Sequence, residues 1–480
     1  MRSKLCIGFL AVVVFFALFI PVCGAVLGLH GPEAASPVSL VPSDRLLVVA
    51  PHPDDEVIGC GGLLWTALQK GCEVRVLYIT NGDGYWHATE RVFKRVFPRE
   101  TDFISLGNLR REEAIAALSR LEVPQDQAVF LGFPNGGMDR LWGDFWSPER
   151  LYRSPHTRQQ SSPYPYSYRS KAPYCGSELW SEIIEILGSW RPTSVVLPHP
   201  QDTHPDHWAT AAFLDLAVEG LHQGSLGEKI PQRFYYMVHR GKWPAPYGYD
   251  PVRTLSPPKG LEGLGLWTPF PLAEEAVVRK RSALEEYRSQ LRVSSKFLMS
   301  FVAKGELFCE FPEKKLPLTW PQLIEVDGRT EDWAGLDPLS VEPTQDNIVG
   351  RLESSGDFSA IWGCDDSENL YLRLDTQGPI SSRTLYTVFL KIVNPDTAVY
   401  PLMIQINGRR VKCSISSLQV KSAFRSNHLE LSVPLTFAPR FRTDLASSQL
   451  ISVQAFSSRY VQVDHTAPLV LHRATPVSTP

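Results

Sequence analysis

The sequence feature that most constrains the fold is an alternation, from Arg45 onward, of short β-branched runs with longer segments of helical spacing. Strands that alternate with helices in this way indicate βαβ units and a parallel sheet. In such sheets ligands bind beyond the carboxyl ends of the strands, so residues that directly follow a strand are the candidates for chemistry. The predicted strands are 45–50, 73–79, 128–133, 194–198 and 233–239, and the predicted helices are about 57–70, 108–121, 177–190 and 206–220.

The predicted fold class is α/β, a Rossmann-like, mostly parallel sheet with helices on both faces, over residues 44–315. Two long loops are predicted at 82–106 and 138–176, and one further helix at about 273–304. After Cys309 the helical periodicity fades, and short alternating runs separated by turn residues predict an all-β sandwich over 316–480. Those runs are 358–362, 370–375, 385–393, 399–406, 428–433 and 450–456.

The N-terminal segment differs from the rest of the chain. Two basic residues precede an uncharged run from Leu5 to Leu29, which predicts an export signal at 1–25 and a linker at 26–43. The same run is long enough to span a bilayer, so an uncleaved anchor is the alternative. We therefore expect an exported protein, periplasmic, cell-surface or extracellular, which would associate with a membrane only in the alternative where this segment is kept as an anchor.

Composition narrows the class of partner. The 480 residues include 48 basic and 51 acidic side chains, a net charge of −3, which offers no broad basic face for nucleic acid phosphates. Nucleic acid is therefore not an expected partner, and no pattern indicates an oligomeric state. Six cysteines lie beyond the leader, and a chain of this size can fold without disulfides, so mostly buried free thiols are expected.

Two polar clusters follow predicted strands and are the candidates for chemistry. Pro51–Glu56 reads PHPDDE after the first strand, and His204–His207 reads HPDH after the fourth. Acids that cap a helix N-terminus and histidines in turns would explain each cluster separately, but not both at one edge of the same sheet. Imidazoles and carboxylates brought together from two loops form a nitrogen and oxygen set suited to zinc.

The two motifs resemble those of the PIG-L/LmbE family of zinc-dependent N-acetylglucosaminyl deacetylases, over about residues 44–310. Weaker matches are Thr80–Gly84, Arg110 with Glu113, Gly132–Pro134 and Ser289–Gln290.

The resemblance implies a role for each residue of the two motifs. His52, Asp55 and His207 would be the zinc ligands, and Asp54 the general base. His204, as a protonated imidazole, would stabilise the oxyanion, and Asp206 would orient an adjacent histidine. A histidine and carboxylate set also accepts iron, manganese or cobalt, so other divalent metals are possible.

Two further residues are predicted to bind substrate. Arg110 would contact it, although pairing with Glu113 at helical i,i+3 spacing is an equal alternative. The family often carries aspartate where this chain has Asn135. Asparagine keeps a hydrogen-bonding carbonyl and loses the charge, so a weakened contact to a sugar hydroxyl is expected there.

The C-terminal region carries a second resemblance. Ile324–Trp333 and Trp362–Tyr371 are similar to segments of family-9-type carbohydrate-binding and DOMON-like β-sandwiches. Such modules bind sugar or serve as packing units, and both interpretations stay open here.

Together these features predict an exported metal-dependent deacetylase that hydrolyses the N-acetyl amide of N-acetylhexosamine units in a glycan or glycoconjugate. The export signal favours an envelope or extracellular saccharide as its partner. The alternative is a non-catalytic extracellular carbohydrate-binding protein with a decayed deacetylase domain, which Asn135 and the C-terminal region motivate.

Overall fold

The computed structural model describes residues 38–224, 231–319, 323–344, 353–394, 397–438, 450–459 and 462–473. The predicted signal or anchor at 1–25 lies outside the described residues and stays a prediction. Of the predicted linker at 26–43 the structure describes only 38–43, and this assignment also stays a prediction. In the described part of the chain, no helix combines the length and the apolar character needed to cross a bilayer.

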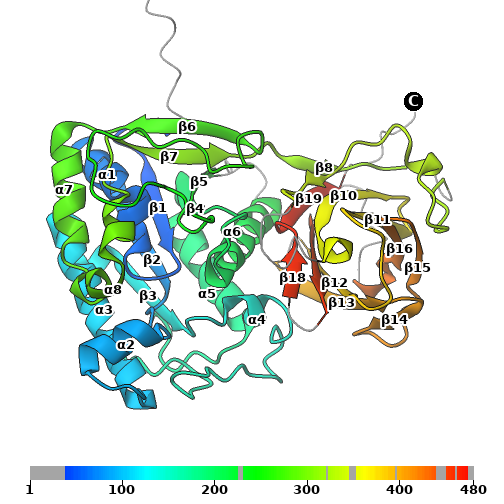
Figure 1. The fold of residues 1–480 in the computed structure, drawn as a ribbon, viewed down its shortest axis with the longest axis horizontal. Helices are drawn as coiled ribbons and strands as arrows, with labels where there is room; N and C mark the ends of the chain where they lie inside the picture. The colour runs from blue at the N-terminus through cyan, green and yellow to red at the C-terminus, as the bar shows by residue number, and fades with distance from the viewer. Residues whose placement is uncertain are drawn as a thin grey trace, which may run out of the picture. The chain divides into compact units, whose positions relative to one another are not determined.

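A seven-stranded sheet organises the α/β region, in the order β3-β2-β1-β4-β5-β7-β6 (Figure 1). The first five strands are parallel, and the last two form an antiparallel edge. The predicted α/β class with a mostly parallel sheet is thus confirmed. The strands are β1 (Arg45–Ala50), β2 (Glu73–Thr80), β3 (Ala128–Phe133), β4 (Ser194–Pro198), β5 (Gln232–Tyr236), β6 (Leu266–Pro271) and β7 (Gly305–Glu310).

From Leu46 to Ala50, β1 is buried on both faces, which explains the unbroken apolar sequence of this stretch. Leu46 and Val48 join one hydrophobic cluster, whereas Leu47 and Val49 join another. Residues of α1 (Asp55–Gln69), α3 (Glu100–Arg120) and α7 (Glu274–Leu284) complete the first cluster. Residues of α5 (Gly176–Trp190) and α6 (Pro205–Gly224) complete the second. Helices therefore cover both faces of the sheet.

Several elements differ from the prediction. The helix expected at 273–304 is two helices, α7 and α8 (Arg288–Met299), because the chain turns at 285–287. The two predicted loops contain short helices, α2 (Trp86–Phe93) and α4 (Met138–Trp142). The edge strands β6 and β7 were not predicted, since β6 holds two prolines that read as loop.

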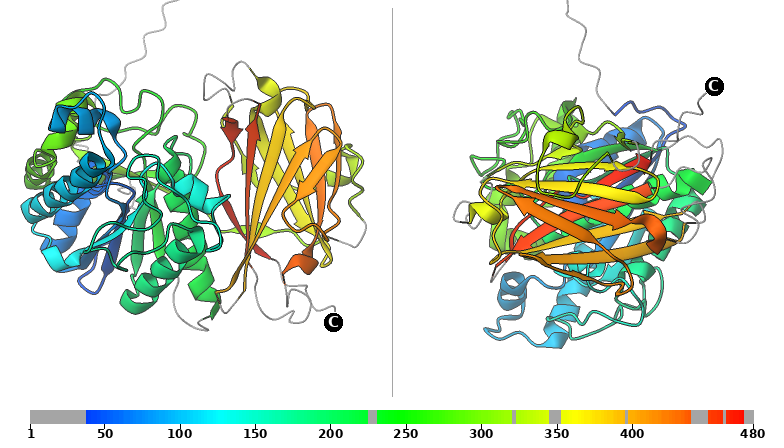
Figure 2. Two further views of the ribbon diagram at one scale, coloured as in Figure 1. Left: turned by 90° about the horizontal axis from the view of Figure 1, so that it is seen from below. Right: turned by 90° about the vertical axis from the view of Figure 1, so that its right-hand side faces the viewer.

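The C-terminal region consists of two mainly antiparallel sheets, with strand orders β15-β16-β11-β10-β9 and β14-β13-β12-β17-β19-β8, and with β18 on β17 (Figure 2). All six predicted runs are strands, so the strand-rich character is confirmed. Side chains such as Leu372 of β11 and Leu390 of β12 share one core between the sheets. The strands are β8 (Lys314–Leu316), β9 (Ser340–Val341), β10 (Phe358–Asp365), β11 (Asn369–Thr376), β12 (Leu385–Val393), β13 (Val399–Asn407), β14 (Arg410–Cys413), β15 (Lys421–Arg425), β16 (His428–Pro434), β17 (Leu450–Ser458), β18 (Gln462–His465) and β19 (Leu469–Arg473).

The α/β region and the C-terminal sheets share buried contacts within one compact unit, Ser36–Pro480. Val393 and Leu450 of the sheets join the hydrophobic cluster of α5 and α6. Lys391 is buried and donates to the carbonyl oxygen of Trp142 at 2.7 Å. Its Nζ lies 3.7 Å from the centroid of that indole ring. The domain boundary predicted at 315/316 stays a prediction.

The cysteine prediction agrees with the structure. All six cysteines beyond the leader are free, and five of them are buried.

The strand order places the two sequence motifs side by side. β2 and β3 lie on one side of β1, while β4 and β5 lie on the other. β1 and β4 are parallel neighbours, with Leu46 opposite Ser194 and Val48 opposite Val196. The chain segments that leave these two strands therefore meet where the strand order reverses, which is the usual place for a ligand in an open α/β sheet.

Candidate active site and metal centre

Three of the predicted metal ligands converge at the switch point. His52 Nδ1 lies 3.1 Å from Asp55 Oδ2, His207 Nε2 lies 3.2 Å from the same oxygen, and the two ring nitrogens are 3.3 Å apart. All three side chains are buried. Ligand atoms about 2.0 Å from a tetrahedral ion lie about 3.3 Å from one another, so this triangle has the dimensions of one face of a zinc site.

The other nitrogen of each imidazole is held by a carboxylate. His52 Nε2 lies 3.0 Å from Asp206 Oδ2, and His207 Nδ1 lies 3.1 Å from Asp202 Oδ2. Histidines that bind metals usually donate their second N–H to such a partner, which fixes the ring and leaves the other nitrogen free for the ion. The residues present therefore fit a zinc-like divalent ion at His52, Asp55 and His207.

Asp202 is a residue that the sequence reasoning missed. Its Oδ2 also accepts hydrogen bonds from the backbone N–H groups of Val238 and His239, so one buried carboxylate ties the β4 loop to the segment after β5. The signal in the sequence was a carboxylate five residues before His207, but that spacing alone does not distinguish it from a turn former.

The turn that presents Asp54 is strained. Its φ of 120° and ψ of −29° are unusual for a residue with a side chain, and they occur where β1 passes sharply into α1. The side chain of Glu56 stabilises the turn by accepting from the Asp54 N–H at 3.0 Å. Glu56 accepts in turn from the Tyr287 hydroxyl. Strained residues of this kind cluster at functional sites.

Asp54 and Arg110 form an ion pair, with Oδ1 and Nη2 3.1 Å apart. Burial raises the pKa of Asp54 to about 7, although the Arg110 charge opposes the shift. Arg110 also donates to the Gly82 carbonyl at 3.0 Å. The alternative in which Arg110 pairs with Glu113 is wrong, because the Glu113 carboxylate accepts from the N–H and hydroxyl of Ser289 instead.

His204 is placed beside the three ligands but differs from expectation in its charge. Burial, together with the neighbouring His52 and His207 charges, lowers the pKa of His204 to about 3. The predicted protonated imidazole is therefore a neutral one. His204 Nδ1 accepts from the Asp206 N–H at 3.2 Å, so the proton of the neutral ring resides on Nε2 and can be donated.

Asp206 Oδ2 contacts Nε2 of His52 from the other motif, whereas the sequence predicts that Asp206 orients an adjacent histidine. Its Oδ2 also accepts from Asn135 Nδ2 at 2.9 Å and from the Gly136 N–H at 2.7 Å, and its Oδ1 accepts from the Met138 N–H at 3.1 Å. Asn135 Oδ1 accepts from the Gly84 N–H at 2.7 Å. Both ends of the Asn135 amide are thus engaged within the protein.

His239 is a second residue that sequence reasoning missed. Its ring centroid lies 4.8 Å from that of His207 and 5.2 Å from that of His204. Besides the triangle of His52, Asp55 and His207, two further overlapping sets of described residues have potential ligand atoms within 4.8 Å of one another: His52, His204 and His207, and Asp55, His207 and His239. The predicted strand 233–239 extended over His239, which concealed that it lies beyond the end of β5.

These groups line a cavity of about 620 Å³ beyond the carboxyl ends of the strands. Six of the eight predicted site residues face it, and Asp206 and His207 lie directly behind them. Aromatic side chains form much of the remaining wall. The predicted residues in the lining are His52, Asp54, Asp55, Arg110, Asn135 and His204, and the aromatic ones are Tyr85, Trp243, Tyr247 and Phe297.

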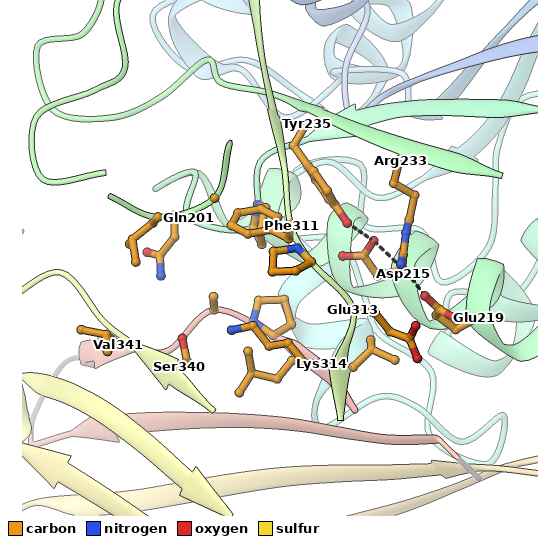
Figure 3. A pocket seen from close by; sticks show the side chains of 18 of the residues that line it. Gln201, Asp215, Glu219, Arg233, Tyr235, Phe311, Glu313, Lys314, Ser340 and Val341 are labelled. Carbon is orange, nitrogen blue, oxygen red and sulfur yellow. Dashed lines mark hydrogen bonds and ion pairs between the residues drawn. The ribbon is translucent and has the colours of Figure 1, made fainter. Parts of the chain in front are cut away.

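A second cavity, of about 230 Å³, lies between the α/β region and the C-terminal sheets (Figure 3). None of the predicted site residues lines it. Three of its charged groups are paired with other lining residues: Asp215 accepts from the Tyr235 hydroxyl at 2.6 Å, and Arg233 pairs with both Asp215 and Glu219. The cavity at the strand ends is therefore the candidate active site.

The fold and site define an α/β protein with a candidate histidine and carboxylate metal centre at the switch point of its sheet. Residues 47–218 match the PIG-L family, described as GlcNAc-PI de-N-acetylase. The chain thus contains a PIG-L family domain, as the two motifs indicated.

Two curated relatives are the 1D-myo-inositol 2-acetamido-2-deoxy-alpha-D-glucopyranoside deacetylases of Mycobacterium sp. strains KMS and JLS. Each is 31% identical over 183 residues, which are 38% of this chain and 51% of theirs. The chain therefore spans about half the length of the curated relatives it matches.

Similar solved structures include the conserved protein TT1542 from Thermus thermophilus, with 23% identity, a TM-score of 0.34 and coverage of 57% of this chain and 99% of that one. Another is the N,N'-diacetylchitobiose deacetylase from Pyrococcus horikoshii, with 18% identity, a TM-score of 0.34 and coverage of 56% and 84%.

Proposed function

We propose that this protein is a zinc-dependent deacetylase that hydrolyses the N-acetyl amide of an N-acetylglucosamine-type sugar. The observation that carries the proposal is the convergence of His52 Nδ1, Asp55 Oδ2 and His207 Nε2 within 3.3 Å at one end of the cavity, with Asp54 beside them. The match of residues 47–218 to the PIG-L family and the activities for which the curated relatives are named support the choice of bond.

The chemistry divides between the ion and the chain. A divalent ion at His52, Asp55 and His207 would polarise the amide carbonyl and lower the pKa of a water molecule. Asp54 takes the proton from the attacking water, a role that suits a carboxyl group whose pKa is raised to about 7 by burial. Arg110, 3.1 Å from Asp54, holds that carboxylate at the edge of the cavity.

His204 and Asp206 complete the proposed machinery. The neutral His204 ring donates from Nε2 to the oxygen that gains negative charge, since its Nδ1 is occupied by the Asp206 N–H. Asp206 holds His52 through Nε2, so that Nδ1 faces the ion. As the C–N bond breaks, Asp54 donates this proton to the leaving nitrogen, and acetate and a free amino sugar result.

The proposal also specifies the class of substrate and where the protein meets it. We propose that the substrate is an N-acetylhexosamine unit of an exported glycan or glycoconjugate, because residues 1–25 have the character of an export signal or anchor. The aromatic wall of Tyr85, Trp243, Tyr247 and Phe297 offers ring faces on which a sugar can stack. A cavity of about 620 Å³ is within the range for small-ligand sites.

The experiment that tests this function measures acetate release from N-acetylglucosamine monomers, oligomers and lipid-linked forms, with zinc content determined on the same sample. We expect release from at least one class and about one zinc per chain. Saccharide binding without any acetate release, at full zinc occupancy, would instead support the non-catalytic carbohydrate-binding alternative.

Metal dependence is tested on the best substrate of that series. We expect a chelator to abolish acetate release and stoichiometric zinc to restore it, because the ion polarises the carbonyl. Full activity in metal-free protein would remove the proposed mechanism.

A further inference from the structure

Asn135 occupies the position at which a sugar contact was expected, yet its side chain is almost fully buried and both of its polar atoms are bonded to the protein. Oδ1 accepts from the Gly84 N–H at 2.7 Å, and Nδ2 donates to Asp206 Oδ2 at 2.9 Å. Chemistry determines which end of the amide is which, because a backbone N–H needs an acceptor and a carboxylate needs a donor.

The bond to Asp206 distinguishes asparagine from aspartate at this position. An aspartate has the same shape, and it could still accept from Gly84, but it has no N–H to offer. Two carboxylates would then face each other at about the 2.9 Å that now separates Nδ2 from Oδ2, which strongly disfavours two negative charges. At position 135 the local structure therefore favours a side chain that donates to Asp206 without adding a negative charge, which an amide does at every pH.

The carboxylate that Asn135 contacts is the one that holds a predicted metal ligand. Asp206 Oδ2 is shared by Asn135 Nδ2, the Gly136 N–H and His52 Nε2. His52 presents its other nitrogen to Asp55 and His207. An unbroken series of short contacts thus connects the Gly84 loop after β2, Asn135 after β3, Asp206 after β4 and His52 after β1.

We infer that Asn135 is a positioning residue, which acts through Asp206 on His52, rather than a substrate contact. An effect of Asn135 on catalysis rests on the proposed function, whereas its effect on metal binding does not. The neutral amide of Asn135 donates to Asp206 where an aspartate would add a second negative charge. Asp206 alone therefore supplies the carboxylate that contacts His52 Nε2.

The variant that tests the inference is Asn135→Asp, with Asn135→Ala as a second change that removes both hydrogen bonds and adds no charge. Metal affinity is measured by zinc competition against a chromophoric chelator, and the ligand geometry by the absorption spectrum of the cobalt form. We expect Asn135→Asp to weaken zinc binding by about 10–100-fold, as other changes behind metal-bound histidines do, and to alter the cobalt spectrum. Asn135→Ala should have a smaller effect on both.

Asn108→Asp is the matched control, because it introduces the same charge on α3 and retains its function as acceptor for the Tyr166 hydroxyl. It should bind zinc as the unchanged protein does. Thermal unfolding of all variants without metal separates a folding defect from a change in the metal site.

A direct sugar contact predicts the opposite pattern. Carboxylates accept from hydroxyls more strongly than amides, so Asn135→Asp would then leave zinc affinity unchanged and lower KM for the saccharide. That result would overturn the inference. If no saccharide is deacetylated by the unchanged protein, the proposed function fails, while the zinc measurements still decide the role of Asn135.

Discussion

The α/β region and the C-terminal sheets both bury networks of charged and aromatic side chains, but they use them differently. In the C-terminal sheets, Arg373 donates twice to Asp375, at 3.0 Å each, and its guanidinium lies 4.1 Å from the ring centroid of Trp362. Asp375 also accepts from Trp362 Nε1 and pairs with His428. This network satisfies its own donors and acceptors.

The network of the α/β region leaves ligand atoms directed at one point. Asp206 and Asp202 take the far nitrogens of His52 and His207, so that their near nitrogens face Asp55. Buried charge is therefore not by itself the sign of a site. What separates the two regions is the direction of the remaining lone pairs, and of the two networks only that of the α/β region directs them toward one point, as a metal site requires.

The largest expected effect comes from Asp54→Asn, which removes the proton acceptor and leaves the ligands in place. Asparagine also tolerates a positive φ, so the strained turn should persist. We expect acetate release to fall by about 10²–10⁴-fold with unchanged zinc content. Activity within a few-fold of the unchanged protein would show that Asp54 is not the base.

A smaller effect is expected from Asp202→Asn, which weakens the hydrogen bond that fixes His207. Zinc affinity should fall by about 10–100-fold, as measured by chelator competition. Asp375→Asn is the matched change in the C-terminal sheets. It should lower the unfolding temperature, because Arg373 loses a buried partner, while zinc affinity stays unchanged.

Equal zinc affinities in Asp202→Asn and Asp375→Asn would contradict the comparison. The two networks would then both be structural, and the convergence of His52, Asp55 and His207 would not depend on its supporting carboxylates.

The smallest expected effect concerns stability and pH. Glu182 of α5 is buried, and in the described part of the chain neither of its carboxylate oxygens has a hydrogen-bond partner. Burial raises the pKa of Glu182 to about 8. Its contribution to stability is therefore complete below its ordinary pKa of 4.5 and is lost as the pH rises to about 8.

Glu182→Gln should consequently raise the unfolding temperature at pH 8, by about 2–4 °C for each kcal/mol gained, and change it little at pH 4.5. Glu430→Gln is the comparison in the C-terminal sheets. Glu430 accepts from Trp333 Nε1 and from the Asp327 and Gly328 N–H groups, so its loss should destabilise the protein by about 1–3 kcal/mol. Calorimetry at pH 4.5 and pH 8 measures the unfolding temperature of both variants. A lower unfolding temperature for Glu182→Gln than for the unchanged protein at pH 8 would contradict the raised pKa of Glu182.

Much of the candidate site could be predicted because it follows strands of recognisable pattern. His52, Asp55 and His207 were placed at one sheet edge from their positions after 45–50 and 194–198, and the structure brings them together. Asp202 and His239 could not be found in this way. Asp202 lies in a turn, and His239 lies at the end of a predicted strand, 233–239, that extends beyond the actual end of β5. The contacts of both residues join segments that only the sheet brings together.

The helices and strands also divide into those that the sequence predicts and those that depend on tertiary contacts. The sequence predicts both ends of α5 and the end of α3 to within one residue, but α3 begins at Glu100, eight residues before its predicted start, and the short α2 and α4 lie within predicted loops. The break between α7 and α8 was also missed, because charged residues continue the helical pattern through 285–287. Edge strands β6 and β7 depend on pairing with each other, which local sequence does not reveal.

The sequence by itself determined the α/β class, the strand-rich C-terminal region and the residue types of the candidate metal centre, because period and motif are local properties. Only the tertiary structure decided how these residues act. Burial keeps His204 neutral and raises the pKa of Asp54, Arg110 pairs with Asp54 instead of Glu113, and Asn135 bonds to Asp206. Charge state and hydrogen-bond partner depend on which side chains the fold brings within about 3 Å, and those lie far apart in the sequence.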